Sequence, residues 1–179
     1  MKLFYAIDIP KSGVKHLLND TRELREDYAH FSWIPDANLH ITLHYIGERS
    51  VHKIPKIVGQ TEIALFDVVP THLYAFGLDI FINSNITIYV AFQKNRTIQT
   101  TSDRLSSIQL PQKKRSFIPH LTVARAKIPS KQQYLHLKKK LHKTDIDLDF
   151  PVTTIHLYES IARPKFPLYR KVHSFKLSR

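Results

Sequence analysis

Two short segments of the 179-residue sequence share one pattern of histidine and threonine. Residues 39–43 read LHITL and residues 119–123 read PHLTV, so each contains His, an apolar residue, Thr and a second apolar residue. Side chains two positions apart on a β-strand project from the same face, about 6.5 Å from each other. Each segment therefore presents one imidazole and one hydroxyl to the same ligand, an arrangement that suits a phosphate group.

The repeat predicts a duplicated half-site in which His40, Thr42, His120 and Thr122 surround one phosphate. Two imidazoles suit this place because a pKa of about 6.5 allows one to be protonated and act as a general acid while the other, neutral, acts as a general base. The alternative is that both histidines are half-buried residues of a sheet. A third His-x-Thr, at His142, has polar neighbours and falls at the end of an expected helix, so we do not count it as a site.

The charge balance favours an anionic partner. The sequence holds 27 Lys and Arg against 15 Asp and Glu, a net charge of +12 at pH 7. Nucleic acid or a nucleotide is the expected partner, since clustered cations gain free energy by releasing counterions, and the alternative is a solvated basic surface. The sequence has no cysteine, which excludes disulfides, thiol nucleophiles and thiolate metal sites and favours a cytoplasmic protein.

Other classes of function find no support in the sequence. No segment approaches the roughly 20 apolar residues of a membrane span, and the opening has too few apolar residues for a signal peptide. His40 and His44 would lie about 13 Å apart on a strand, so we expect no metal there. The four glycines are scattered and form no phosphate-binding loop, so we expect neither ATP-dependent chemistry nor any cofactor.

Hydrophobic periodicity predicts a mixture of strands and helices with no linker between them. Apolar residues recur at helical spacing from Val14 to Tyr28, and Ser130 and Gln133 have the spacing of a capping box. Further helices are expected over 51–65, 96–108 and 130–142. Strands are expected over 2–9, 39–46, 71–80, 86–93, 118–126, 151–158 and 168–177. In the second strand, alternation places Leu39, Ile41, Leu43 and Tyr45 on one face and His40, Thr42, His44 and Ile46 on the other, with Gly47 ending the strand.

The chain resembles the 2H phosphoesterases, and within them the RNA 2′,3′-cyclic phosphodiesterases, also called 2′-5′ RNA ligases. The resemblance lies in the segments LFYAIDIP, WIPDANLHITLHYIGE, IPHLTVARAK and PLYRKVHSFKL. It implies an α+β, bilobal fold in which two β-sheet lobes are related by pseudo-twofold symmetry, with helices outside and an active-site groove between the lobes. Residues 1–179 would form one domain of two intertwined lobes.

The resemblance also implies roles for individual residues. His40 would be the proton donor, His120 the proton acceptor, and Thr42, Thr122 and Arg125 would bind the phosphate. Strict alternation places Arg125 on the face opposite His120, so a strand end or a bulge after Ala124 would be needed to turn it back.

Several further residues are candidates for substrate contact. Trp33 precedes the first motif, where it would either stack on a base or pack in the core. His44 shares the expected face of His40, with a solvent-facing histidine as the alternative. Tyr169 and Arg170 match a Tyr-Arg pair of the family. The basic residues Lys113, Lys114 and Arg115 precede the second motif and are expected to contact an RNA backbone.

The function expected from these observations is metal-independent hydrolysis of RNA 2′,3′-cyclic phosphate ends to 2′-phosphate. One alternative is a basic RNA-binding module without activity. Another is the same chemistry on 2′,5′-linked RNA or on small cyclic nucleotides. We expect a monomer without a protein partner, because no heptad or apolar strip indicates an interface.

Overall fold

The computed structural model describes residues 1–108 and 117–178. The strands are β1 (Lys2–Asp8), β2 (Ser32–Trp33), β3 (His40–Glu48), β4 (Thr71–Ile82), β5 (Ile86–Phe92), β6 (His120–Ala126), β7 (Asp149–Val152), β8 (Thr154–Ile161) and β9 (Leu168–Lys176). The α-helices are α1 (Lys11–Asp20), α2 (Arg22–Asp27), α3 (Ile54–Leu65), α4 (Arg96–Ile108) and α5 (Lys131–Lys143), and short 3₁₀ helices cover Asp36–Asn38 and Val51–Lys53.

The strands form one antiparallel sheet built from two halves. Its order is β7-β4-β5-β6-β3-β1-β8-β9, and β2 pairs with β6. The two strands that carry the histidine motifs, β3 and β6, meet at the centre and are joined through one pair, Ile41 opposite Leu121. Each half therefore begins with a motif strand and continues outward through three more strands, which confirms the expected fold of two β-sheet lobes.

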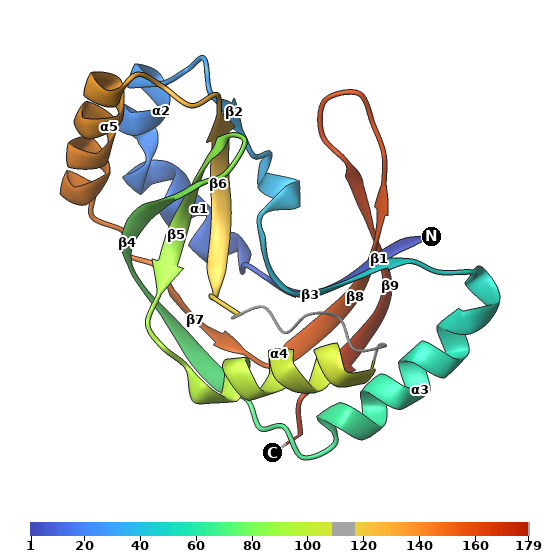
Figure 1. The fold of residues 1–179 in the computed structure, drawn as a ribbon. Helices are drawn as coiled ribbons and strands as arrows, with labels where there is room; N and C mark the ends of the chain where they lie inside the picture. Colours follow the sequence, from blue (N-terminus) through green and yellow to red (C-terminus); the bar gives the residue numbers. More distant parts are fainter. Residues whose placement is uncertain (109–116, 179) are drawn as a thin grey trace.

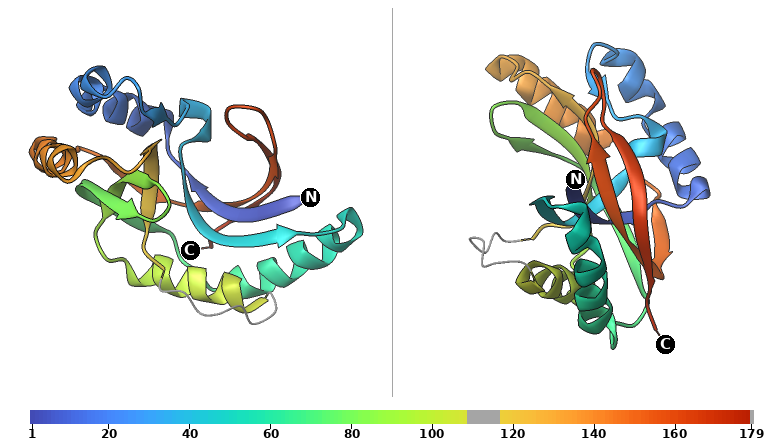
Figure 2. Two further views of the ribbon diagram at one scale, coloured as in Figure 1. Left: turned by 45° about the horizontal axis from the view of Figure 1, so that its top comes forward. Right: turned by 90° about the vertical axis from the view of Figure 1, so that its right-hand side faces the viewer.

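The helices lie outside the sheet, and one of them connects its two halves (Figures 1 and 2). Helices α1, α2 and α5 lie together at one end of the molecule, and α3 and α4 lie together at the other. The first group is joined by an ion pair between Lys140 and Asp27. In the second group, the Ser102 hydroxyl of α4 donates to the Leu43 carbonyl of β3 at 2.7 Å. Helix α4 thus follows β5 in the sequence but packs on the other half of the sheet.

Apolar side chains of the central strands make the core. Five consecutive residues of β1, Leu3 to Ile7, are buried, and side chains cover both faces of the strand: the ring of Phe4 lies against Tyr158 and that of the next residue, Tyr5, against Phe175. A strand covered on both faces has no need of polar alternation, which explains its continuous apolar run. Helix α4 buries Ile98, Thr101, Ser102 and Leu105, and α5 buries Leu137 and Leu141, at the three- to four-residue spacing of one helix face.

The expected strand over 151–158 is wrong as a single element. The chain forms β7 up to Val152, which pairs with β4, and then β8 from Thr154, which pairs with β1 in the other half. The buried positions change phase at this crossing, from Phe150 and Val152 to Ile155 and Leu157. The two-residue strand β2 was not predicted, because so short a segment has no periodicity.

Strict alternation along β3 fails after His44. Tyr45 is 52% exposed and Ile46 only 1% exposed, the reverse of the expected faces. Opposite β1, the register moves from Tyr45 to Gly47 between neighbouring residues Phe4 and Leu3, so Ile46 is the extra residue of a β-bulge. Gly47, with φ of 81°, supplies the left-handed backbone of this bulge and lies inside the strand instead of ending it.

The predicted capping box of α5 is present. The Ser130 side chain accepts a hydrogen bond from the Gln133 backbone, and the Gln133 side chain accepts one from Ser130 N at 3.0 Å. We expect Ser130→Ala to lower the free energy of unfolding by about 1 kcal/mol, because the helix loses an N-cap acceptor. Urea unfolding measures this loss. Ser130→Thr keeps the hydroxyl and should lose less, so equal losses for the two variants would contradict the prediction.

Candidate active site

The two histidine motifs line one small pocket where the halves of the sheet meet. Continuing the antiparallel register from Ile41 opposite Leu121 sets residue 40 across from 122 and residue 42 across from 120. The pocket has a volume of about 160 Å³. It is lined by His40, Thr42, His120, Thr122 and Arg125 together with Ile34, Asn38, Phe166, Pro167 and Tyr169.

Each imidazole is oriented by a hydrogen bond of the same kind, from Nδ1 to the backbone carbonyl two residues earlier. Nδ1 of His40 lies 2.7 Å from the Asn38 carbonyl, and Nδ1 of His120 lies 2.7 Å from the Ile118 carbonyl. A carbonyl only accepts, so each Nδ1 carries a proton and donates it. In the neutral ring Nε2 is then the atom that can accept a proton, and in the charged ring Nε2 carries the proton that can be given to a ligand. Proton exchange with a ligand is thus directed to Nε2 in both motifs.

Thr42 takes part in the first motif directly. Its hydroxyl lies 3.0 Å from Nε2 of His40, so it donates to a neutral imidazole and accepts from a charged one. When it accepts from His40, its own proton is available to a second acceptor. The threonine of the motif therefore links the charge state of the imidazole to the hydrogen bond offered to an anion in the pocket.

Aromatic rings pack against each imidazole. The ring centroid of His40 lies 5.2 Å from Phe4 and 5.0 Å from Tyr169. The ring centroid of His120 lies 5.1 Å from Phe81 and 5.6 Å from Tyr89. Burial and the nearby Asp79 raise the pKa of Tyr89 to about 12, so its hydroxyl stays neutral. Such packing restricts the rotation of the imidazoles and keeps them ready for a ligand.

A β-bulge turns Arg125 into the pocket. Between Ile88 and Tyr89 of β5, the paired residue on β6 moves from Ala124 to Thr122, so Val123 is the extra residue. The bulge reverses the alternation beyond it, and Arg125 lies on the face of His120 and Thr122. Arg125 therefore lines the same pocket as His120 and Thr122, through a bulge that precedes Ala124 instead of following it.

The pocket depresses the basicity of His40. Burial lowers the pKa of His40, and the charges of His120 and Arg125 act in the same direction, while the Asn38 carbonyl and the carboxylate of Asp8 oppose them. Asp8 accepts hydrogen bonds from the Tyr158 hydroxyl at 2.7 Å and from Lys171 Nζ at 2.9 Å. Although burial raises it, these bonds and the charge of His156 lower the pKa of Asp8 overall, so Asp8 is ionised near neutral pH.

We expect the imidazole of His40 to titrate below about pH 6.5 in the free protein, because desolvation disfavours its charged form. Histidine NMR signals followed against pH measure the midpoint. Asp8→Asn removes a charge that favours the imidazolium and should move the midpoint to still lower pH. Asp79→Asn, beside Tyr89 in the other half of the sheet, is the matched control and should leave His40 unchanged. An upward shift in the Asp8 variant would contradict this electrostatic account.

Two of the sequence candidates lie away from this pocket. Trp33 is partly buried against the core, where its Nε1 donates to the Tyr28 carbonyl at 2.9 Å and the Arg25 guanidinium lies 4.6 Å from its ring. His44 does not line the pocket, and its Nε2 has no hydrogen-bond partner among residues 1–108 and 117–178. Burial lowers the pKa of His44, with a smaller effect from Arg49.

Of the two candidates near the C-terminus, Tyr169 lines the pocket and Arg170 does not. Tyr169 lines the pocket and meets His40 edge to face, and burial raises the pKa of its hydroxyl although Arg125 opposes the shift. Arg170 points elsewhere, with its NH2 group 2.5 Å from a carboxylate oxygen of Glu159. The candidates Lys113, Lys114 and Arg115 lie outside the described residues.

Sequence reasoning missed the loop residues that close the pocket. The Asn38 side chain donates to the Pro167 carbonyl at 2.8 Å, which joins the entry to the first motif with the loop between β8 and β9. Phe166 and Pro167 of that loop line the pocket. The sequence signal was the short polar turn PDAN before His40, which is typical of a chain reversal but does not identify its distant partner.

The described part of the chain contains neither a cluster of metal ligands nor a helix that would span a membrane. Over residues 1–108 and 117–178, no three His, Asp or Glu side chains are grouped so that they would hold a metal ion. No helix of these segments is long and apolar enough to cross a membrane.

Comparison with known proteins identifies the family. The RNA 2′,3′-cyclic phosphodiesterase of Methanocaldococcus jannaschii is 26% identical over 178 residues, which cover 96% of this chain and 98% of that protein. TT0787 of Thermus thermophilus shares the fold, with a TM-score of 0.78 and 21% identity over 99% of this chain and 98% of that one. E. coli LigT complexed with 3′-AMP does so too, with a TM-score of 0.75 and 20% identity over 99% and 98% of the two chains. A sequence model of the 2′-5′ RNA ligase superfamily matches residues 13–163, most of the sequence, and the chain belongs to that superfamily.

Proposed function

We propose that this protein hydrolyses the 2′,3′-cyclic phosphate at the end of an RNA to a 2′-phosphate, without a metal ion. The observation that carries the proposal is the pair of imidazoles in one pocket with Arg125, each with Nδ1 committed to a backbone carbonyl, which directs proton transfer to Nε2. In His40 this Nε2 also lies 3.0 Å from the Thr42 hydroxyl. The relative from M. jannaschii, which matches almost the whole chain, is named an RNA 2′,3′-cyclic phosphodiesterase.

The reaction needs one proton removed and one supplied. His120 as general base takes a proton from water while the water oxygen forms a bond to phosphorus. The bond from phosphorus to the ribose 3′ oxygen breaks, and His40 as general acid protonates that oxygen. The product is a 2′-phosphate beside a free 3′-hydroxyl. His40 is left neutral and His120 charged, and exchange with solvent restores both.

Arg125 and the two threonines stabilise the negative charge on the non-bridging phosphate oxygens. A guanidinium offers two parallel donors to a phosphate, and hydroxyls of Thr42 and Thr122 add neutral donors. A bound phosphate anion also favours the protonated form of His40, against the desolvation that lowers its pKa in the free protein. Substrate binding thus charges the acid at the place where it is needed.

The size of the pocket fits a reactive end better than a whole nucleotide. Its volume of about 160 Å³ is below the roughly 300–1,000 Å³ typical of sites that enclose a small molecule. We infer that the phosphate and part of the ribose enter it, while the base and the rest of the chain lie outside. The surplus of 12 positive charges supports an RNA chain there.

Phosphorus NMR on an oligonucleotide with a 2′,3′-cyclic phosphate end, in excess EDTA, tests the proposal. We expect the cyclic signal to be replaced by that of a 2′-phosphate. Formation of a 3′-phosphate would overturn the assignment of acid and base, and a requirement for added metal would overturn metal independence. Tight RNA binding without turnover would favour the binding module, and turnover of a 2′,5′-linked joint alone would favour the other substrate class.

A further inference from the structure

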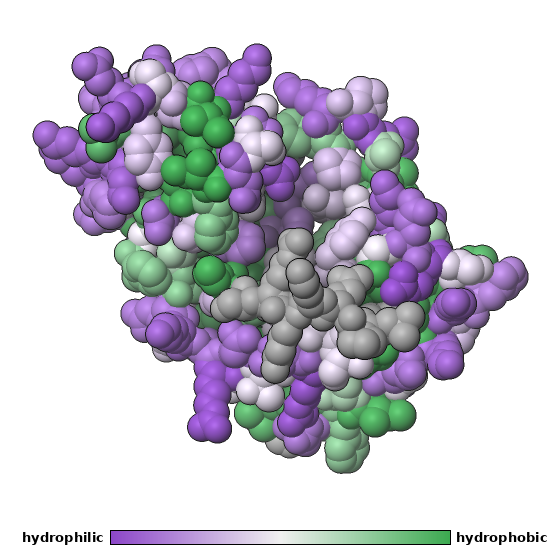
Figure 3. All heavy atoms as spheres, in the orientation of Figure 1, coloured by the Kyte–Doolittle hydropathy of each residue, from purple (hydrophilic) through white to green (hydrophobic). Residues whose placement is uncertain are grey.

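A second pocket lies beside the first, between the segment that follows α2 and the segment that joins β6 to α5. Its volume is about 460 Å³. Arg125 lines both this pocket and the pocket of the two histidines, so one side chain borders both spaces. Figure 3 shows hydrophobic surface on this face, where β6 runs into α5, bordered by hydrophilic side chains.

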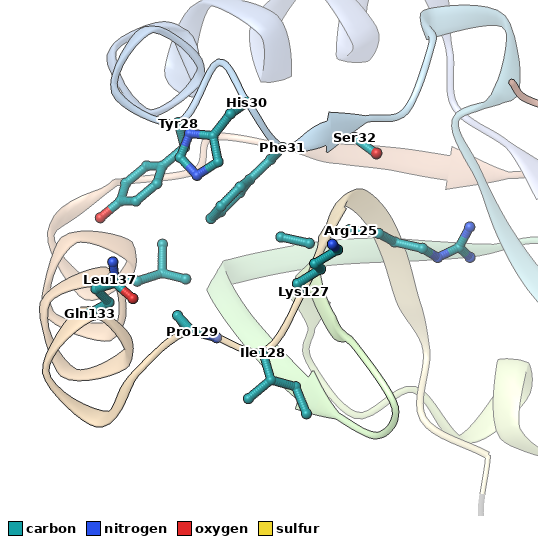
Figure 4. Close-up of a pocket in the computed structure, with 11 residues that line it drawn as sticks. Tyr28, His30, Phe31, Ser32, Arg125, Lys127, Ile128, Pro129, Gln133 and Leu137 are labelled. Atoms are coloured by element: carbon teal, nitrogen blue, oxygen red, sulfur yellow. The ribbon is translucent and has the colours of Figure 1, made fainter.

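One wall of this pocket is a cluster of three rings. Phe31 lies 4.9 Å from the ring of Tyr28 in a stacked arrangement and 4.7 Å from the ring of His30 edge to face. Figure 4 shows these rings on one side and Gln133 and Leu137 of α5 on the other. The space between them is lined by aromatic rings and by the apolar side chains of Ile128, Pro129 and Leu137, the kind of surroundings in which an unpaired nucleobase stacks.

The ring cluster is held rigidly against the catalytic strand. Phe31 N donates to the Tyr28 carbonyl and Trp33 N to the Phe31 carbonyl, each at 3.0 Å. Strand β2 then pairs with β6, with Ser32 opposite Arg125. The ring cluster is thus formed before any ligand binds, and its position is fixed relative to Arg125, which lines both pockets.

The charged side chains that line the pocket are positive, which suits the phosphates of a nucleic acid. Lys127 and Arg125 lie along it, and no acidic side chain lines it in the described part of the chain. A terminal cyclic phosphate occupies both the 2′ and the 3′ oxygen of the last ribose, so the rest of the RNA continues only from its 5′ side. The parts of the RNA left outside the histidine pocket are therefore the base of the last nucleotide and the nucleotides on its 5′ side, and only the latter bring a further backbone phosphate within reach of a side chain such as Lys127.

We propose that this second pocket binds the base of a nucleotide upstream of the cyclic phosphate, by stacking on Tyr28, His30 and Phe31 while Lys127 contacts the backbone. This rests on the proposed function, because it takes the RNA end to lie in the histidine pocket. Stacking tolerates any base, so the subsite adds affinity for chain length with little sequence preference.

The test compares a mononucleoside 2′,3′-cyclic phosphate with a trinucleotide that ends in the same cyclic nucleotide. We expect a kcat/KM roughly tenfold higher for the trinucleotide, and loss of this advantage when the upstream nucleotides are abasic. Phe31→Ala and Lys127→Ala should each reduce the advantage severalfold and leave the mononucleotide unchanged. Phe66→Ala, an exposed ring at the end of α3, and Lys139→Ala on α5 are matched controls.

Three results would overturn the subsite: equal kcat/KM for the two wild-type substrates, an advantage that survives both variants, or variants that slow the mononucleotide as much as the trinucleotide. Turnover of the mononucleotide reports separately on the proposed function. If no turnover occurs, a binding measurement still tests the subsite. The fluorescence of Trp33, the single tryptophan, then reports the binding of a trinucleotide that ends in a 2′-phosphate. The wild type should then bind it about tenfold more tightly than Phe31→Ala or His30→Ala does, and equal binding would overturn the subsite.

Discussion

His40→Ala and His120→Ala are each expected to lower kcat on a 2′,3′-cyclic phosphate by about 10² to 10⁴. Each variant removes the Nε2 atom that the backbone hydrogen bond directs into the pocket, and the methyl group left behind transfers no proton. The double variant should be little slower than either single variant, because acid and base act together on one step. Initial rates from the NMR assay measure all three.

The sequence provides a matched control for these variants. His142 is the third histidine followed two positions later by threonine, but it is exposed near the end of α5. His142→Ala should retain full activity. A rate within tenfold of the wild type for His40→Ala or His120→Ala, in a variant whose unfolding temperature is unchanged, would contradict the proposed mechanism.

A substrate with sulfur in place of the 3′ oxygen separates the two roles. A thiolate leaves without a proton, since thiol pKa values lie near 8.5 instead of the much higher values of alcohols. The sulfur substrate should restore most of the rate to His40→Ala and little to His120→Ala. Rescue of His120→Ala alone would reverse the assignment.

The sequence predicted the elements of the fold well where periodicity extends over many residues. The helix over 96–108 and the capping box of α5 are confirmed. The errors fall where a local irregularity changes the phase of the pattern, as at the bulge in β3 and at the crossing from β7 to β8. Such changes are determined by the partners across the sheet, and a single sequence does not show which strands will pair.

For the site, spacing predicted which residues share a face but not what encloses them. His40 and His120 reach one pocket because β3 and β6 are neighbours, although 80 positions separate them in the sequence. The aromatic supports Phe4 and Phe81 come from β1 and β4, where an apolar residue in a strand has no distinguishing signal. The second pocket was not foreseen for the same reason, since its walls belong to segments about 100 residues apart.

Arg125→Gln is the second change expected to have a large effect, a loss of about 10² to 10³ in kcat/KM. The bulge at Val123 turns this side chain toward the two motifs, where its guanidinium faces the non-bridging oxygens of the proposed substrate. Gln keeps a polar, hydrogen-bonding group on a shorter side chain but removes the charge and the paired donors. Steady-state rates on the mononucleoside cyclic phosphate measure the loss without a contribution from upstream nucleotides.

Arg125→Lys separates charge from geometry. Lysine restores the charge as a single point but lacks the planar pair of donors, so it should recover only part of the rate. Arg96→Gln, which alters an exposed arginine at the start of α4 that does not line the pocket, is the control and should change kcat/KM less than twofold. The bulge at Val123 would have no catalytic consequence if Arg125→Gln behaved like this control, and the phosphate would then be held by the threonines and imidazoles alone.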